Sequence, residues 1–209
     1  MQPREEWTAE SEFLVSGFER RMWAPLCAVA ANQVLASVTA TMPTTAPSGA
    51  EEMAIDAVAM LARGCSIAEL DEWSERFRCL VEALDANQAF YPDSAFYDPR
   101  LRALDAFLGA VSMGLERASR GATFAAIDVV YSVRECHSAF GFLDPACEDP
   151  YDADMVYSSP FQLALRDAWR GIVASPELTI ETGMALSGEF SEYLADVAKK
   201  RHARGGGGG

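Results

Sequence analysis

Histidine and lysine are scarce in this sequence of 209 residues, which has two of each. The two histidines, His137 and His202, lie far apart, and neither has a second ligand nearby except Cys136, which would face another direction on a helix. Zinc sites and Ser-His-Asp triads both depend on histidine, and the Gly-Lys-Ser/Thr ending of a phosphate-binding loop is also missing. We therefore expect no catalytic residue, no metal site and no cofactor.

Cysteine is present in an odd number, without any Cys-x-x-Cys pair, which predicts reduced thiols rather than a disulfide framework. The N-terminus is too polar for an export signal. No apolar run reaches the roughly 18 residues of a membrane span; the closest, 24–36, is interrupted by Asn32 and Gln33. These absences predict a soluble, cytoplasmic protein.

Positive charge is also scarce in most of the chain. Positions 1–198 carry all 31 acidic residues and 13 of the 17 basic ones, a net charge of −18, and the other four basic residues lie in the tail 199–204. Such a field repels nucleic acid and anionic membranes and attracts basic surfaces. We expect a basic protein as partner, and neither nucleic acid nor membrane.

Start signals for helices recur along the chain, and strand signals do not. The four clearest are two capping boxes, Ser48-x-x-Glu51 and Ser66-x-x-Glu69, and two caps followed by a first-turn proline, Asp98-Pro99 and Ser159-Pro160. Between them, apolar residues follow the helical period. The pattern predicts one all-α domain over 1–204, a helical bundle of about seven to nine helices without a sheet. The five glycines at 205–209 are expected to form a flexible tail.

Three details can be predicted within this bundle. A first helix is expected from a cap at Thr8 to about Arg21. The nearly continuous apolar run 127–133 predicts that the helix beginning at Thr123 is the central, buried one. Trp73 and Trp169 stand at the spacing of core residues.

Two segments carry a resemblance to a known family: Glu19-Arg20-Arg21-Met22-Trp23-Ala24-Pro25 and Ala103-Leu104-Asp105-Ala106-Phe107, followed by the 121–140 helix and the helix with Trp169. In the order of these elements the chain resembles the YjaG-like family of small bacterial proteins. The resemblance implies an all-helical fold and transfers no catalytic residue. The chain is also similar, as a class, to the small acidic helical immunity proteins with which bacteria block a cognate toxin.

The segment 144–154 concentrates acid, with five carboxylates, and no lysine or arginine occurs between Arg134 and Arg166. A solvated loop and a docking surface for a basic protein are both possible readings. A third takes Glu148, Asp149 and Asp152 as a variant of the aspartate-rich magnesium motif, although Pro150 argues against the continuous helix which that motif needs. Further carboxylates line the helix from Ser66 and could extend the acidic surface. The candidate partner-binding residues are Asp144, Glu148, Asp149, Tyr151, Asp152, Asp154, Tyr157, Glu69 and Glu72.

The leading hypothesis from the sequence is a non-enzymatic acidic binding protein. It would be an immunity protein that neutralises a basic toxin, such as a nuclease, by covering its positive surface. One alternative is a magnesium-dependent helical enzyme acting on a phosphorylated or diphosphate substrate. The other is a housekeeping scaffold or regulator.

Overall fold

The chain folds as a bundle of α-helices in the computed structural model, which describes residues 4–86, 98–175 and 177–205. Within these ranges there are nine α-helices and no strand, which confirms the predicted all-α class. The α-helices are α1 (Arg4–Ser16), α2 (Trp23–Thr41), α3 (Ala50–Arg63), α4 (Ile67–Ala86), α5 (Pro99–Ser119), α6 (Ala126–Ala139), α7 (Ala153–Ser158), α8 (Pro160–Val173) and α9 (Ile180–Gly205). Short 3₁₀ helices span Arg20–Met22, Gly121–Thr123 and Phe140–Phe142. Gly205, which was predicted to belong to the flexible tail, is the last residue of α9, and the rest of the predicted tail, 206–209, lies outside the described residues.

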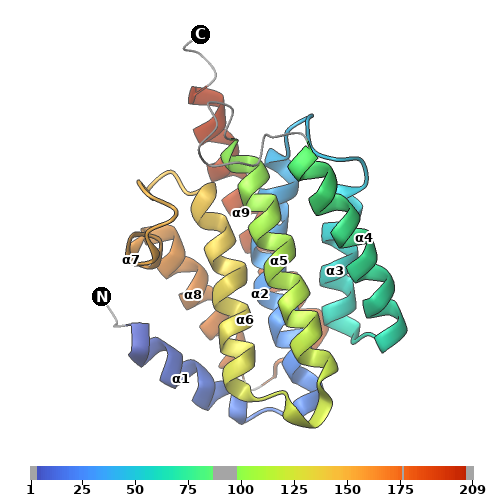
Figure 1. The fold of residues 1–209 in the computed structure, drawn as a ribbon. Coiled ribbons are helices and arrows are strands. Elements are labelled where there is room, and N and C mark those ends of the chain that lie inside the picture. Colours follow the sequence, from blue (N-terminus) through green and yellow to red (C-terminus); the bar gives the residue numbers. More distant parts are fainter. Residues whose placement is uncertain (1–3, 87–97, 176, 206–209) are drawn as a thin grey trace.

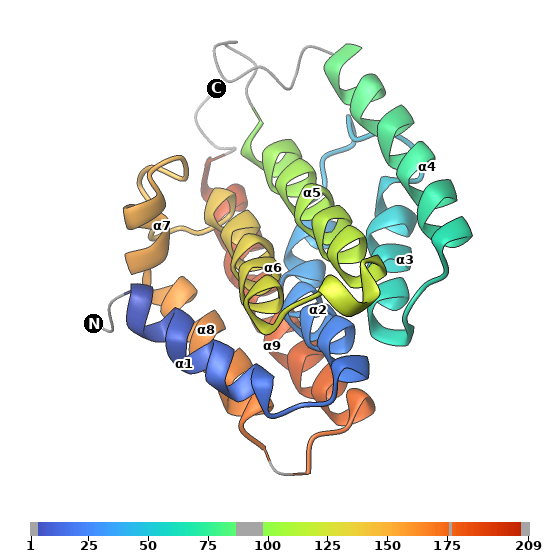
Figure 2. The same ribbon diagram turned by 60° about the horizontal axis from the view of Figure 1, so that its bottom comes forward.

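Helix α2 is the central element of the bundle. It packs against α9, α3, α6 and α5, which surround it in both ribbon views (Figures 1 and 2). The expectation that the helix bearing 127–133 would be central is wrong: α6 leaves Tyr131 exposed, whereas most of α2 is buried. Small side chains give α2 this place, since buried alanines at 28, 30 and 31 let neighbouring helices approach closely.

The contact between α2 and α9 also contains polar groups. The Asn32 side-chain amide donates to the Met184 carbonyl over 3.0 Å and to Ser187 Oγ over 2.8 Å. The Ala36 N–H donates to Ser191 Oγ over 2.9 Å. These bonds fix the register of the two helices, because a shift along the axis would leave the buried groups without partners.

The segment Arg20–Thr41, which includes α2, is long and apolar enough by length and composition to cross a membrane; no other described helix is. Within the structure, 67% of its apolar window is buried against other helices. Its polar residues Asn32 and Gln33 both bond to other elements of the bundle.

Three of the predicted helix starts are confirmed. At α4 the Ser66 N–H donates to Glu69 Oε2 over 2.8 Å, and the Glu69 N–H donates to Ser66 Oγ over 3.3 Å, so both halves of the capping box are present. The side chains of Asp98 and Ser159 accept first-turn N–H groups at the starts of α5 and α8. In all three cases the hydrogen bond that caps the helix joins residues only a few positions apart in the sequence.

The prediction of a capping box at Ser48 is wrong. Gly49 is the N-cap of α3, with φ of +84° and no side-chain cap bond. This left-handed turn suits glycine and starts the helix at Ala50, one residue after the cap.

Two other boundaries also differ from expectation. Helix α1 begins at Arg4 rather than after Thr8 and ends at Ser16. Helix α6 begins at Ala126 rather than near Thr123, because the Asp128 carboxylate accepts the Ala125 N–H over 2.9 Å and caps the helix there.

The two serines provide a matched test of capping. We expect Ser66→Ala to lower the free energy of unfolding by about 1 kcal/mol, because it removes a working N-cap. Ser48→Ala removes the same hydroxyl from an exposed site that makes no cap bond. Its free energy of unfolding should stay within about 0.5 kcal/mol of that of the parent. Urea denaturation of both variants measures the difference, and equal losses would contradict the assignment of the cap.

Candidate partner-binding surface and an adjoining pocket

The acidic segment is folded back on itself by its own carboxylates. Asp149 accepts the Tyr151 N–H over 2.9 Å. Asp152 is the N-cap of the short helix α7 and accepts the N–H groups of Asp154 and Met155, over 2.9 and 3.2 Å. Asp149 and Asp152 therefore have a structural use in addition to any role in binding.

Asp144 does not lie on the expected surface. Its side chain is fully buried, where it accepts the Ala146 N–H over 2.7 Å and the hydroxyl of Ser159. Because Ser159 also caps α8, Asp144 ties the acidic segment to the N-terminus of that helix, where negative charge is favoured. The assignment of Asp144 to a partner-binding surface is therefore corrected to a structural one.

The remaining carboxylates of the segment are exposed, and none of them forms an ion pair with a cation of the described chain. Two large side chains stand among them, Tyr151 at 55% and Met155 at 45% exposure. The term acidic face is used below for the exposed side chains of Glu148, Asp149, Tyr151, Asp152, Asp154 and Met155. It combines negative charge with apolar surface.

Glu69 and Glu72 do not join this face. They belong to α4, and α4 and α7 lie on opposite sides of the bundle in both ribbon views (Figures 1 and 2). Glu69 is also engaged within the chain: the Ser66 N–H and hydroxyl and the Arg63 guanidinium, 2.8 Å away, lower its pKa to about 2. The structure therefore separates the predicted residues into two groups, and one extended acidic surface does not form.

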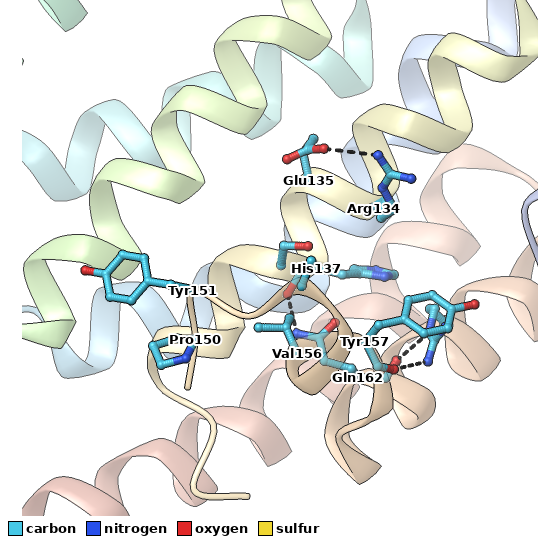
Figure 3. A pocket seen from close by; sticks show the side chains of 11 residues that line it. Arg134, Glu135, His137, Pro150, Tyr151, Val156, Tyr157 and Gln162 are labelled. Carbon is cyan, nitrogen blue, oxygen red and sulfur yellow. Dashed lines mark hydrogen bonds and ion pairs between the residues drawn. The ribbon is translucent and has the colours of Figure 1, made fainter. Parts of the chain in front are cut away.

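A pocket of about 230 Å³ adjoins the acidic segment, between α6, α7 and α8 (Figure 3). Pro150 and Tyr151 from the acidic segment and Val156 and Tyr157 of α7 contribute to its lining. Polar and charged groups come from the flanking helices, namely Arg134, Glu135, His137 and Ser138 of α6 and Gln162 and Arg166 of α8. Tyr157, predicted as a binding residue, is half-buried and belongs to this pocket rather than to the acidic face.

His137 is held by hydrogen bonds to two other helices. Its Nε2 lies 2.9 Å from Gln33 Oε1 of α2, and its backbone carbonyl accepts the Gln162 amide of α8 over 2.6 Å. Burial, with a smaller contribution from the Arg166 charge, lowers the pKa of His137 from 6.5 to about 3. The ring is therefore neutral at physiological pH.

Arg166 is the most deeply buried cation that the structure describes, at 4% exposure. Its Nε donates to the Gln162 carbonyl over 3.1 Å and one terminal nitrogen to the Tyr157 carbonyl over 2.6 Å. The guanidinium carbon lies 3.5 Å from the centre of the Tyr157 ring, a cation–π contact. No carboxylate of the described residues forms an ion pair with it.

Sequence reasoning missed Gln33, Gln162 and Arg166. The signal that could have identified them is polarity at a core position. Gln162 and Arg166 share the buried face of α8 with Leu165 and Trp169, at the helical period. A polar residue on such a face needs an internal partner, which points to a buried network.

The magnesium alternative receives no support from this geometry. Among the described residues no three His, Cys, Asp or Glu side chains are grouped so that they could hold a metal ion. Pro150 lies between the acidic residues, and α7 begins only at Ala153, so Glu148, Asp149 and Asp152 do not project from one helix.

The fold and site together define an all-α helical bundle with an exposed acidic face and a neighbouring polar pocket. Comparison with protein-family models, with curated proteins and with solved structures gave no match. The resemblance to the YjaG-like family stays a prediction from the sequence.

Proposed function

We propose that this protein is a non-enzymatic binding protein of the immunity type, which neutralises a basic protein by covering its positive surface with the acidic face. The observation that carries the proposal is the combination of exposed carboxylates without internal ion pairs and two exposed large side chains, Tyr151 and Met155. In a protein with a formal net charge of −14, these carboxylates add to a field that attracts cations.

The two components of the face would act at different stages of binding. Exposed carboxylates steer a basic partner during approach and raise the association rate. Tyrosine and methionine are enriched in interface cores, where they supply contact area and slow dissociation. Tyr151 is suited to this role because its ring packs edge-on against Phe142, with centroids 5.4 Å apart, which orients the exposed ring.

The partner to test is a basic protein encoded immediately beside this gene, since an immunity gene lies next to its toxin gene. We expect direct binding and protection of growth when the two are co-expressed. The double variant Glu148→Gln/Asp154→Asn should lower the association rate constant roughly threefold to tenfold at low salt, measured by stopped-flow or surface plasmon resonance. Its salt dependence should be shallower than that of the parent.

The matched control is Asp71→Asn/Glu72→Gln on α4, which removes the same charge from exposed positions on the opposite side. It should leave the association rate close to that of the parent. Tyr151→Ala should instead raise the dissociation rate about tenfold. Absence of binding, a rate independent of salt, or equal effects of the two double variants would remove the proposal.

A further inference from the structure

The pocket beside the acidic segment contains a charge that the protein does not neutralise itself. Arg166 is buried, always protonated at neutral pH, and forms no ion pair among the described residues. Buried charges are normally paired, because the loss of water around an isolated ion is costly. The carbonyls of Tyr157 and Gln162 satisfy only part of this requirement.

The bonds that Arg166 makes leave a donor available. They use Nε and the terminal nitrogen Nη2, and no carboxylate of the described residues forms an ion pair with the guanidinium through Nη1. A carboxylate that enters the pocket could accept from this nitrogen and supply the missing negative charge. Because the Tyr157 carbonyl and ring hold the guanidinium in place, the donor is preorganised for such a ligand.

The rest of the lining also decides the class of ligand. Pro150, Val156 and the Tyr157 ring supply the apolar part of the lining, called the apolar wall below, which suits a flat ring. The lining also contains the acidic side chain of Glu135. A guanidinium nitrogen of Arg134 lies 3.6 Å from its carboxylate at the rim, so these two charges offset each other (Figure 3). The carboxylates of the acidic face are exposed, where water and salt screen them, whereas Arg166 is only 4% exposed and lines the pocket.

We propose that the pocket between α6, α7 and α8 binds a small aromatic carboxylate, with Arg166 as the group that binds the carboxylate and the apolar wall as the contact for the ring. The volume of about 230 Å³ limits the ligand to a compact molecule, smaller than the usual drug-sized ligand. Occupation of the site would also brace the segment that carries the acidic face, because Tyr151 and Tyr157 line the pocket.

Three probes of similar shape and different charge test the proposal: benzoate, benzamide and benzamidine. Titrations of the full chain followed by NMR should show benzoate shifting the amides of 134–138 and 150–166, with an affinity about tenfold or more above that of neutral benzamide. The cation benzamidine should bind more weakly still. Equal affinities for the three probes, or no shift with benzoate, would overturn the proposal.

Two substitutions locate the binding. Ser138→Leu fills the pocket from α6 without changing charge and should abolish the benzoate shifts, whereas Ser74→Leu on α4, outside the pocket, should preserve them. Arg166→Gln removes the charge and should weaken benzoate about tenfold, with less effect on benzamide. Unchanged binding by Ser138→Leu would overturn the proposal even if Arg166→Gln failed to fold.

Discussion

Replacing Trp169 by alanine is expected to destabilise the protein by about 4 kcal/mol, near the upper end of what single substitutions do. Trp169 of α8 is fully buried, its indole N–H donates to the Leu26 carbonyl over 3.2 Å, and its ring lies 6.2 Å from that of Trp7. One side chain thereby connects α8 to both α2 and α1. Its removal would leave a large cavity, which the surrounding helices can fill only in part, and would remove the hydrogen bond to α2.

Urea denaturation measures this loss of stability, because the midpoint and the slope of the unfolding transition together give the free energy of unfolding. Trp169→Phe keeps most of the packing and should lose less than the alanine variant. Phe13→Ala removes an aromatic ring from a site that is 80% exposed and should change stability by less than about 0.5 kcal/mol. A loss below about 1 kcal/mol for Trp169→Ala would show that α8 does not pack as described.

Stability should fall as the pH is lowered from 8 to 5, and His137 should cause this fall. Its pKa is lowered from 6.5 to about 3 in the folded protein, so between these values the unfolded chain binds a proton that the folded chain does not. The contribution of neutral His137 is fully present above pH 6.5 and is lost as the pH falls toward 3. At pH 5 the free energy of unfolding should be about 2 kcal/mol below its value at pH 8.

The window above pH 5 isolates this effect, because carboxylates titrate at lower pH. His137→Gln should remove the dependence between pH 8 and 5, while His202→Gln, a change at the other histidine of the chain, should retain it. Urea midpoints measured across this range test both variants. If the slope persists in His137→Gln, another group is responsible for it.

The helix starts that could be predicted from the sequence depend on local contacts. At Ser66 and Glu69, and at the caps Asp98 and Ser159, the bonded groups are two to three residues apart, so a short pattern contains all of the partners. The prediction failed at Ser48, where the same pattern is present but Gly49 turns the chain through a positive φ. The local sequence favours a cap at Ser48, but the left-handed turn at Gly49 decides where α3 begins.

The candidate site could be predicted only in part. The acidic segment was identified from its composition, and the structure shows most of its carboxylates exposed, but it buries Asp144 and separates the segment from Glu69 and Glu72. Sequence spacing does not report whether a carboxylate meets a serine 15 residues away, as Asp144 meets Ser159. The pocket was missed for the same reason.

By itself the sequence determined the all-α class, several helix starts and an acidic surface, because helical periodicity, capping and net charge are properties of neighbouring residues or of the whole composition. The tertiary structure alone decided that α2 is central, that His137 meets Gln33 across 104 positions and that Arg166 is buried beside a pocket. These features arise when distant helices pack and exclude water, and it is this packing that shifts the pKa of His137 and leaves Arg166 in a pocket where an anion could neutralise it.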